Sequence, residues 1–429
     1  MAVSFFVQTR YGLISNSRSV LRLEDVCVPK VGVQTGPFGS QLHNSDYADH
    51  GVPIITVEHI GDHTITGDSM PLVKPQDAKR LEKYSLRAGD VVFSRVGSVD
   101  RSALVSWKEE GWLFSGRLLR VRPNPSLADA GYLSYFFQLP RFKARMRLIA
   151  VGATMPSLNT AILKDVEVIL PELAEQVAIR KILEVFDKKI ETNRQLSRTL
   201  EGIAQTIFKS WFIDFDPVKA KMSGGNPVGM DAATAVLFPE SMEDSELGLI
   251  PEGWEISTVG NFCPFAYGKA LPARVRNPGS VSVFGSNGVV GVHNSPLLRA
   301  PTIVVGRKGT VGTVNISLKP CWVIDTAFSS SPNNQEDLYL AYFTLQSLKL
   351  EEMNSDGAVP GLNRENVHRL QAQLGTEQVR KVFARVVTPI FEDLFELQHQ
   401  SQTLIAIRDS LLPLLISGKL QIPGEMLVS

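Results

Sequence analysis

Two kinds of hydrophobic pattern alternate along the chain. Short runs rich in β-branched residues lie between Gly, Pro and Asn residues, which is typical of strands. Longer stretches repeat apolar residues every three or four positions, which indicates helices. The sequence therefore predicts a mixed strand-and-helix segment followed by a long helix, and then the same order again. The predicted strands include VPIITV (52–57), DVVFS (90–94), VEVIL (166–170) and TIVVG (302–306).

The two helical stretches resemble the seams of a coiled coil. Each predicted helix has about 38 residues and is about 57 Å long at 1.5 Å per residue. Each apolar stripe needs a partner and the other helix can supply it, so we expect an antiparallel pair. Pro389 is expected to bend or restart the second helix, and Gly418 to end it. The expected seam residues are Phe186, Ile190, Leu196, Leu200, Ile203 and Ile207, with polar Asn193, and Ile390, Leu394, Leu397, Leu404, Ile407 and Leu411, with Ser401.

Internal repetition explains this alternation. RAGDVVFSRVGSVD (87–100) and RAPTIVVGRKGTVG (299–312) are identical at six of fourteen positions without a gap. Two further blocks follow in the same order, so the chain is predicted to contain one unit twice. The matched pairs are Arg95 with Arg307, Pro156 with Pro360, and Glu175 with Glu377.

These patterns predict an α+β fold of two pseudo-symmetric mixed domains separated by two long helices that pack as an antiparallel coiled coil. The expected boundaries are 1–171 for the first mixed domain, 172–222 for the central helix region, 223–249 for an acidic linker, 250–375 for the second mixed domain, 376–420 for the distal helix region and 421–429 for a tail.

Composition limits the class of protein. With 429 residues, 44 % of them hydrophobic, the chain can bury more than one core. Its longest apolar runs, such as LLPLLI (411–416), are far shorter than the roughly 20 residues that cross a membrane. The N-terminus has no signal-peptide pattern, and three scattered cysteines favour neither a disulfide framework nor a zinc cluster. We therefore expect a cytoplasmic protein without a membrane span.

The charge is unevenly distributed. The net charge is zero, but residues 222–268 contain seven acidic and no basic residues. The rest of the chain therefore carries an excess of seven positive charges. Mildly basic domains remain compatible with a nucleic-acid partner. Two similar domains at a fixed separation would suit the reading of two half-sites on a duplex.

Several phrases along nearly the whole chain resemble one known family. They are GPFGSQLHNSDYADHGVPIITVEHI (36–60), DVVFSRVGSV (90–99), FKSWFIDFDPVKAK (208–221), IPEGWEISTVG (250–260), GSNGVVG with GRKGTVG, and LIAIRDSLLPLLISGKL (404–420). In this combination the chain resembles the DNA specificity subunit of type I restriction-modification enzymes. The resemblance implies two variable target recognition domains and two more constant spacer helices that bind methyltransferase subunits.

The resemblance also implies the partners. They are double-stranded DNA and methyltransferase subunits, expected to be two, and whether restriction subunits join them is left open. The methyltransferase is expected to use S-adenosylmethionine, and no cofactor is expected on this chain.

The glycine-rich segments GSNGVVG (285–291) and GRKGT (306–310) first suggest a phosphate-binding loop. The order and spacing of a GxxxxGK[ST] loop are absent, so a nucleotide site is not expected. Two interpretations remain open: tight turns between strands, or side chains that project from those turns toward DNA. The arginines could instead form structural ion pairs. The DNA-binding candidates are Ser286, Asn287, Arg307, Lys308 and Thr310, with first-copy counterparts Arg95 and Ser98.

A basic stretch, RFKARMR (141–147), lies near the end of the first mixed domain. It offers phosphate contacts that would give affinity without sequence preference, or it is a solvated helix face. Its candidates are Arg141, Lys143, Arg145 and Arg147.

Three aromatic residues, Trp211, Phe212 and Phe215, are candidate contacts for a protein partner. The alternative is that they pack the end of the first helix against the second domain. Both interpretations are kept at this point.

No catalytic or metal site is expected. His59 and His63 lack a third ligand with convincing spacing, and the motifs of an amino-methyltransferase, a methyl-donor site or a metal-dependent nuclease are absent. The sequence thus predicts a non-catalytic, DNA-binding specificity subunit that reads a bipartite target, one half-site per domain, and positions its enzymatic partners. The alternative is a pseudo-symmetric coiled-coil adaptor that binds proteins and not DNA.

Overall fold

The structure is a computed structural model of the chain. It describes residues 5–61, 63–67, 69–152, 154–299, 301–353 and 361–427. The chain forms two compact units: unit 1 comprises residues 1–192 and 400–429, and unit 2 comprises residues 193–399. Among the described residues, no helix is long and apolar enough to cross a membrane.

An antiparallel sheet of four strands lies at the centre of unit 1. Its middle strands are buried along their whole length, with apolar residues at most positions and the buried Arg120, which donates to the carbonyl of Val31 and the side chain of Gln34. The strands are, in order, β4 (Val33–Thr35), β11 (Leu118–Val121), β8 (Val91–Ser94) and β9 (Ser102–Leu104).

Unit 2 contains the same sheet with the same strand order and directions. The predicted repeat is therefore confirmed in the fold, since β8 and β19 carry the DVVFS and TIVVG runs. The strands are β16 (Phe265–Tyr267), β22 (Ala327–Ser330), β19 (Thr302–Gly306) and β20 (Val314–Ser317).

The smaller sheets also correspond between the units, and each unit includes one parallel pair. In unit 1 they are β1 (Phe6–Thr9) with β2 (Gly12–Ser15), β3 (Ser19–Arg22) with β12 (Glu167–Leu170), and β10 (Leu113–Phe114), β6 (Val52–Ile55), β7 (Leu72–Val73) and β5 (Tyr47–Ala48). In unit 2 they are β13 (Met242–Ser245) with β14 (Gly248–Pro251), β15 (Glu255–Thr258) with β23 (Gln371–Leu374), and β18 (Gly288–His293), β17 (Val281–Gly285) and β21 (Cys321–Val323).

Short helices cover these sheets. Those of unit 1 are α1 (Pro75–Arg80), α2 (Ala130–Gln138), α3 (Pro140–Ile149) and α4 (Thr160–Lys164). Those of unit 2 are α6 (Asp216–Met222), α7 (Ala232–Ala235), α8 (Val259–Phe262), α9 (Leu338–Ser347) and α10 (Arg364–His368). Part of the range predicted as an acidic linker, 223–249, therefore has regular structure, namely α7, β13 and the start of β14.

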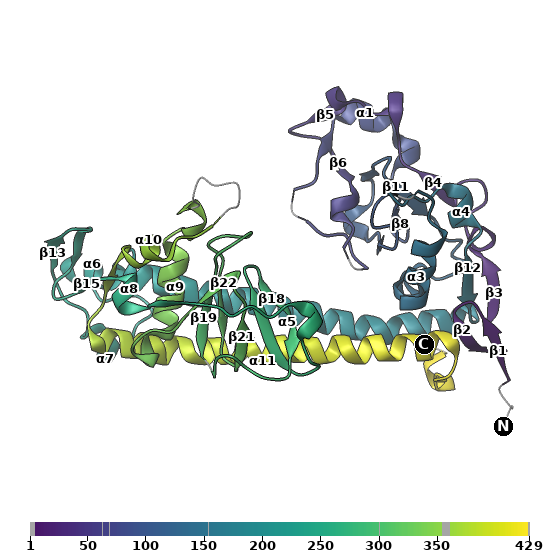
Figure 1. Cartoon of the computed structure of the whole chain (residues 1–429). Coiled ribbons are helices and arrows are strands. Elements are labelled where there is room, and N and C mark those ends of the chain that lie inside the picture. The colour runs from purple at the N-terminus through teal and green to yellow at the C-terminus, as the bar shows by residue number, and fades with distance from the viewer. Residues whose placement is uncertain are drawn as a thin grey trace. The chain divides into compact units, whose positions relative to one another are not determined.

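Two long helices, α5 (Leu173–Phe212, 40 residues) and α11 (Glu377–Ser417, 41 residues), confirm the predicted helix lengths. In each unit a segment of α5 runs antiparallel to a segment of α11 (Figure 1). In unit 1, Asp187 of α5 forms an ion pair with Arg408 of α11 at 2.6 Å. In unit 2, the ring of Phe212 lies 5.1 Å from that of Phe383.

The seam of α5 differs in part from the prediction. Leu196 and Ile203 are 45 % and 46 % exposed, whereas Asn193 and Ala204 are buried. Buried or half-buried residues recur at 190, 193, 197, 200, 204, 207 and 211, spaced three and four apart. A regular heptad thus exists and includes Asn193 as predicted, but Ser197 and Ala204 occupy positions that an apolar pattern does not show.

The second helix also departs from expectation at one residue. α11 continues through Pro389 without a break or restart, and Pro389 is exposed. The predicted stop is confirmed: Gly418 follows the helix with φ of 72°, a conformation that favours glycine, and its N–H donates to the carbonyl of Leu415. Ile407, predicted in the seam, is 41 % exposed.

An equivalent ion pair ties each long helix to its own unit. Arg180 of α5 lies 3.1 Å from Asp129 at the start of α2, and Arg380 of α11 lies 3.1 Å from Asp337 at the start of α9. The pairing of Glu175 with Glu377 stays a prediction. Pro360, matched with Pro156 in the sequence, lies outside the described residues.

Candidate nucleic-acid interface

Arg95 and Arg307 occupy the same place in the two units. Each follows a central strand, β8 or β19, and each backbone carbonyl accepts a hydrogen bond, from Leu158 N–H at 2.8 Å and Leu362 N–H at 2.9 Å respectively. Each guanidinium donates to a backbone carbonyl of the loop before the neighbouring strand, that of Gly116 at 3.0 Å or that of Asp325 at 3.2 Å. The two arginines are therefore held in the same way by the same scaffold.

An exposed aromatic ring accompanies each arginine. The guanidinium carbon of Arg95 lies 5.9 Å from the centre of the Phe38 ring, and Phe38 is 58 % exposed. In unit 2, Arg307 and Arg364 lie 4.7 and 5.1 Å from the centre of the Tyr267 ring, which is 53 % exposed. Such contacts orient a guanidinium while its remaining N–H groups stay accessible.

Ion pairing does not explain these arginines. Within the described ranges, neither Arg95 nor Arg307 forms a salt bridge with a carboxylate. Both side chains are half-buried, and their positive charge is not neutralised by a neighbouring acid there. They therefore remain available to an anionic partner such as a phosphate or to an acceptor on a base.

GSNGVVG forms a tight hairpin between β17 and β18, with Ser286 and Asn287 at its turn. The Ser286 hydroxyl donates to the backbone carbonyls of Lys308 and Thr326, and so ties this turn to the GRKGT loop. Ser286 thus has a structural role, as the turn interpretation expects. Asn287 is exposed at the tip.

The GRKGT loop is shaped by its glycines. A Cβ on Gly306 would lie 2.3 Å from the carbonyl oxygen of Thr310, so a larger residue would push the loop apart. Lys308 and Thr310 are exposed, as is Ser98, the first-copy counterpart of Thr310. The glycines make the turns, as the first interpretation expects, and these polar side chains are exposed on them. Their contact with DNA stays a prediction.

The basic stretch forms α3, and its cations interact with the rest of the protein. Arg141 donates to the carbonyl of Tyr11 at 2.9 Å, and Arg147 forms an ion pair with Asp100. Arg145 and Lys143 are half-buried. We infer that this helix offers less free positive charge than its sequence suggests.

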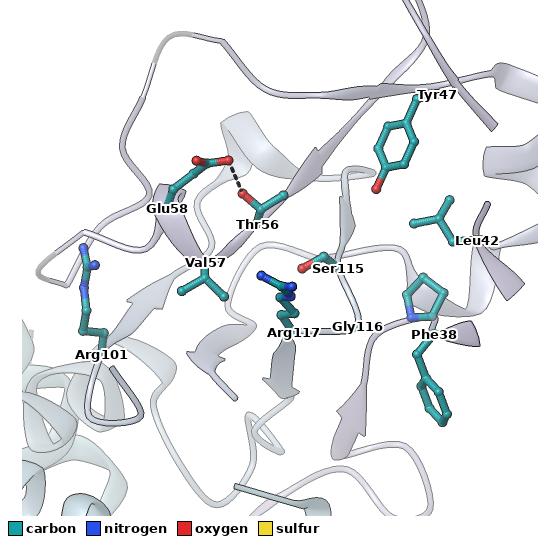
Figure 2. A pocket seen from close by; sticks show the side chains of 11 residues that line it. Phe38, Leu42, Tyr47, Thr56, Val57, Glu58, Arg101, Ser115, Gly116 and Arg117 are labelled. Carbon is teal, nitrogen blue, oxygen red and sulfur yellow. Dashed lines mark hydrogen bonds between the residues drawn. The ribbon is translucent and has the colours of Figure 1, made fainter. Parts of the chain in front are cut away.

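Unit 1 also contains an open cleft of about 700 Å³ beside Arg95 (Figure 2). In this view Glu58 and Arg101 occupy one end, and Phe38, Leu42 and Tyr47 occupy the other, with Arg117 between them. Arg101, Arg117 and Glu58 are exposed. Within the described chain neither arginine has a salt-bridge partner.

The local fold fixes Glu58. It lies in a short 3₁₀ turn, Val57–His59, that directly follows β6. The Thr56 N–H donates to His59 Nδ1 at 3.1 Å, so the buried His59 caps the turn. The Thr56 hydroxyl lies 2.8 Å from Glu58 Oε1 and donates to it. His59 is thus a capping residue, and among the described residues no cluster of His, Cys, Asp or Glu could hold a metal ion.

Sequence reasoning missed Phe38, Glu58, Arg101 and Arg117. They come from separate segments and form one surface only because β6 and β10 pair in parallel. Arg101 had a weak signal, since it lies in the same loop as Arg95 and Ser98. Arg117 corresponds to Thr326 in unit 2. The Arg95 N–H donates to the Arg117 carbonyl, and the Arg307 N–H donates to the Thr326 carbonyl. The sequence gives no sign of this equivalence.

The three aromatic residues proposed as partner contacts are buried in the core of unit 2. Trp211 packs edge-on against Phe238, and Phe212 and Phe215 contact Trp254. Their exposed fractions are 8 %, 1 % and 8 %. The packing alternative therefore holds, and a partner cannot reach these side chains in the folded unit.

Nothing in the described cysteines points to nucleophilic chemistry. All three are buried. Burial raises the pKa of the Cys27 and Cys263 thiols to about 12, so these two stay protonated at neutral pH and are weak nucleophiles.

Comparison with known proteins decides the family. The sequence profile described as "Type I restriction modification DNA specificity domain" matches residues 20–202 and 251–405, one segment in each half of the chain. The chain belongs to this family. The two matched segments agree with the repeat of sheets and long helices described above.

Relatives over most of the chain carry names of the same kind. The chain is 23 % identical to the type I restriction enzyme HindI specificity subunit of Haemophilus influenzae, over 80 % of this chain and 89 % of that protein. It is 27 % identical to the MjaIX specificity subunit of Methanocaldococcus jannaschii, over 83 % and 88 %. The crystal structure of the S subunit of a type I restriction-modification system from M. genitalium has the same fold, with a TM-score of 0.54, 16 % identity, and 93 % and 96 % coverage.

Proposed function

We propose that this specificity subunit binds double-stranded DNA and reads a bipartite target, with one half-site for each unit. The observation that carries the proposal is the repeated arginine. Arg95 and Arg307 lie at equivalent positions, each beside an exposed aromatic ring and each without an ion-pair partner in the described chain. Two equivalent cationic sites suit two half-sites of one duplex.

The chain supplies recognition and its partners supply catalysis. Methyltransferase subunits, expected to be two, bind the long helices and use S-adenosylmethionine; restriction subunits are a further class of partner. The outward-facing apolar residues of α5, such as Leu196 and Ile203, are accessible for such contacts, whereas the buried Trp211 is not.

The test is to express the chain with its cognate methyltransferase subunit in a host without a type I system, and then to sequence modified adenines. The expected result is a split motif, two short defined halves separated by a fixed gap. Purified complex should also bind a duplex with that motif, with an affinity that falls steeply as salt rises, because each phosphate contact releases counterions.

Absence of new methylation from a host in which the two proteins copurify as a complex would contradict the proposal. The chain would then act as a coiled-coil adaptor between proteins. In solution, the adaptor alternative predicts that the chain forms a complex with the methyltransferase subunit at all salt concentrations and that this complex does not retain DNA.

A further inference from the structure

We propose that Glu58 and Asn287 are the same base-reading position in the two units: Glu58 reads the cytosine of a G·C pair in one half-site, and Asn287 reads an adenine in the other. This inference rests on the proposed function and deepens it, because it names one base in each half-site.

The equivalence follows from the parallel strand pairs. Ile55 of β6 pairs with Phe114 of β10, and Phe284 of β17 pairs with Val323 of β21. The residue after each second strand donates its N–H to the first, from Ser115 to the carbonyl of Ile55 and from Ile324 to that of Phe284, both at 2.9 Å. Ile55 and Phe284 therefore correspond.

Counting three residues onward places Glu58 opposite Asn287. Both leave the carboxyl end of a strand in the second sheet of their unit, and both are exposed. Both also lie near the repeated arginine of their unit: the turn of Asn287 is bonded to the Arg307–Lys308 loop through Ser286, and the cleft of Glu58 includes Gly116, which binds Arg95.

The chemistry of the two side chains differs in the way that base recognition requires. A carboxylate only accepts hydrogen bonds, and in the major groove the amino group of cytosine is its donor. A carboxamide both donates and accepts, which matches the N6 and N7 atoms of adenine. A carboxylate close to the phosphates of DNA is repelled by them. Glu58 in this cleft therefore favours DNA binding only where a hydrogen-bond donor of a base meets its carboxylate.

The surroundings of Glu58 fit a G·C pair in particular. Arg101 and Arg117 line the same cleft, and an arginine pairs in a bidentate manner with guanine O6 and N7. The Thr56 hydroxyl donates to one carboxylate oxygen of Glu58 at 2.8 Å (Figure 2), and the Glu58 side chain is exposed. Guanine acceptors and a cytosine donor on one base pair match this set of groups.

Reciprocal isosteric substitutions test the proposal. Glu58→Gln replaces one of two acceptor oxygens with a donor NH2 group, and Asn287→Asp does the reverse, with almost no change in shape. Each variant is expressed with the methyltransferase subunit, and its motif is sequenced. We expect E58Q to lose its preference for cytosine at one position of one half-site, and N287D to lose its preference for adenine at one position of the other half-site. Discrimination between duplexes that differ at that base pair should fall on the order of tenfold in binding assays with purified complex.

Two matched controls carry the same chemical change at exposed sites away from the turns, Glu110→Gln in unit 1 and Asn294→Asp in unit 2. They should leave the motif unchanged. The proposal is overturned if E58Q and N287D methylate the wild-type motif unchanged, if both alter the same half-site, or if they act only as the controls do. A wild-type complex that yields no split motif would instead refute the proposed function, which separates the two failures.

Discussion

Units 1 and 2 share a scaffold but differ in the surface that it carries. The central sheets agree strand by strand, and Arg95 and Arg307 are held by equivalent carbonyls. Beyond the parallel pair, unit 1 has a 3₁₀ turn and a cleft, whereas unit 2 has a two-residue hairpin. Buried strands tolerate little change because their packing is dense, while loops can vary freely. The comparison teaches that a duplicated scaffold can acquire two different recognition surfaces.

The largest expected effect concerns the two helix cores. Phe383 in unit 2 packs against Phe208, Trp211 and Phe212. In unit 1 the buried residues that α5 and α11 contribute to the core, such as Leu183 and Leu412, are aliphatic. Phe383→Ala should reduce the free energy of unfolding by about 3–5 kcal/mol. Hydrogen exchange should show the loss of protection mainly in unit 2. The exposed Val386→Ala is the control, and an equal loss in both variants would contradict the difference.

The next effect separates the two half-sites. Arg95→Ala and Arg307→Ala should each weaken binding of cognate DNA by about 1–3 kcal/mol, and each should relax only the half-site of its own unit. Motif sequencing and binding at fixed salt measure this. Lys319→Ala removes one exposed charge in unit 2 without touching either arginine and should alter neither half. If both variants weakened binding to all DNA sequences equally, Arg95 and Arg307 would be phosphate contacts and would not read bases.

The ion pairs at the start of α2 and α9 are equivalent but not equally bonded. Asp129 caps α2 by accepting from Tyr132 N–H at 2.8 Å and also accepts from Arg180. Asp337 has no such capping bond, and its 3.1 Å contact with Arg380 is not aligned as a hydrogen bond. Asp129→Ala should therefore cost about 0.5–2 kcal/mol, and Asp337→Ala less. Chemical denaturation of the two variants at pH 7 decides it, and a larger cost for Asp337→Ala would reverse the comparison.

A smaller effect concerns a polar contact that only unit 1 has. The Tyr135 hydroxyl donates to Asp187, whereas in unit 2 the ring of Phe343, at the place of Tyr135, lies 5.8 Å from the ring of Phe391. Tyr135→Phe should cost about 0.5–1.5 kcal/mol. Urea denaturation measures it, with the buried Tyr132→Phe, which loses a bond to the carbonyl of Ile169, as a reference in the same unit. No change for Tyr135→Phe would show that the remaining neighbours of Asp187, Arg408 and His63, are enough to satisfy its carboxylate.

The smallest effect is a pH dependence confined to unit 2. Burial raises the pKa of the Asp337 carboxyl, although Arg380 acts in the opposite direction. A raised pKa in the folded state contributes stability that is present below the unfolded pKa of about 4 and is lost as pH rises through the folded value. Asp337→Asn should remove this decline in the free energy of unfolding between the unfolded and the folded pKa of Asp337. Stability curves that stay parallel for the variant and the wild type across that range would refute it.

Much of the fold followed from local pattern. The strands at 52–57, 90–94, 166–170 and 302–306, the two long helices and the duplication were all predictable, because strand and helix periods are written in neighbouring residues. The seam was harder to predict. Leu196 and Ile203 look like core residues in the sequence but face outward, since the small Ser197 and Ala204 take the positions between the predicted Asn193 and Ile207.

The candidate site was only half predictable. Arg95 and Arg307 are visible as a repeated motif, and Asn287 as a turn residue. Glu58, Arg101 and Arg117 are ordinary charges in the sequence, and only strand pairing brings them to one cleft. The aromatic residues at the end of α5 misled in the opposite sense, because an aromatic residue suits a core as well as an interface.

The sequence by itself determined the repeat, the alternation of mixed and helical parts, and the family, because these depend on residue order and local periodicity. The tertiary structure decided which residues are buried and which charges are neutralised. It also places Glu58 and Asn287 three residues beyond equivalent strand positions in the two units. Those properties depend on neighbours that are distant along the chain, and the hydrogen bonds of the parallel strand pairs set the register that brings them together.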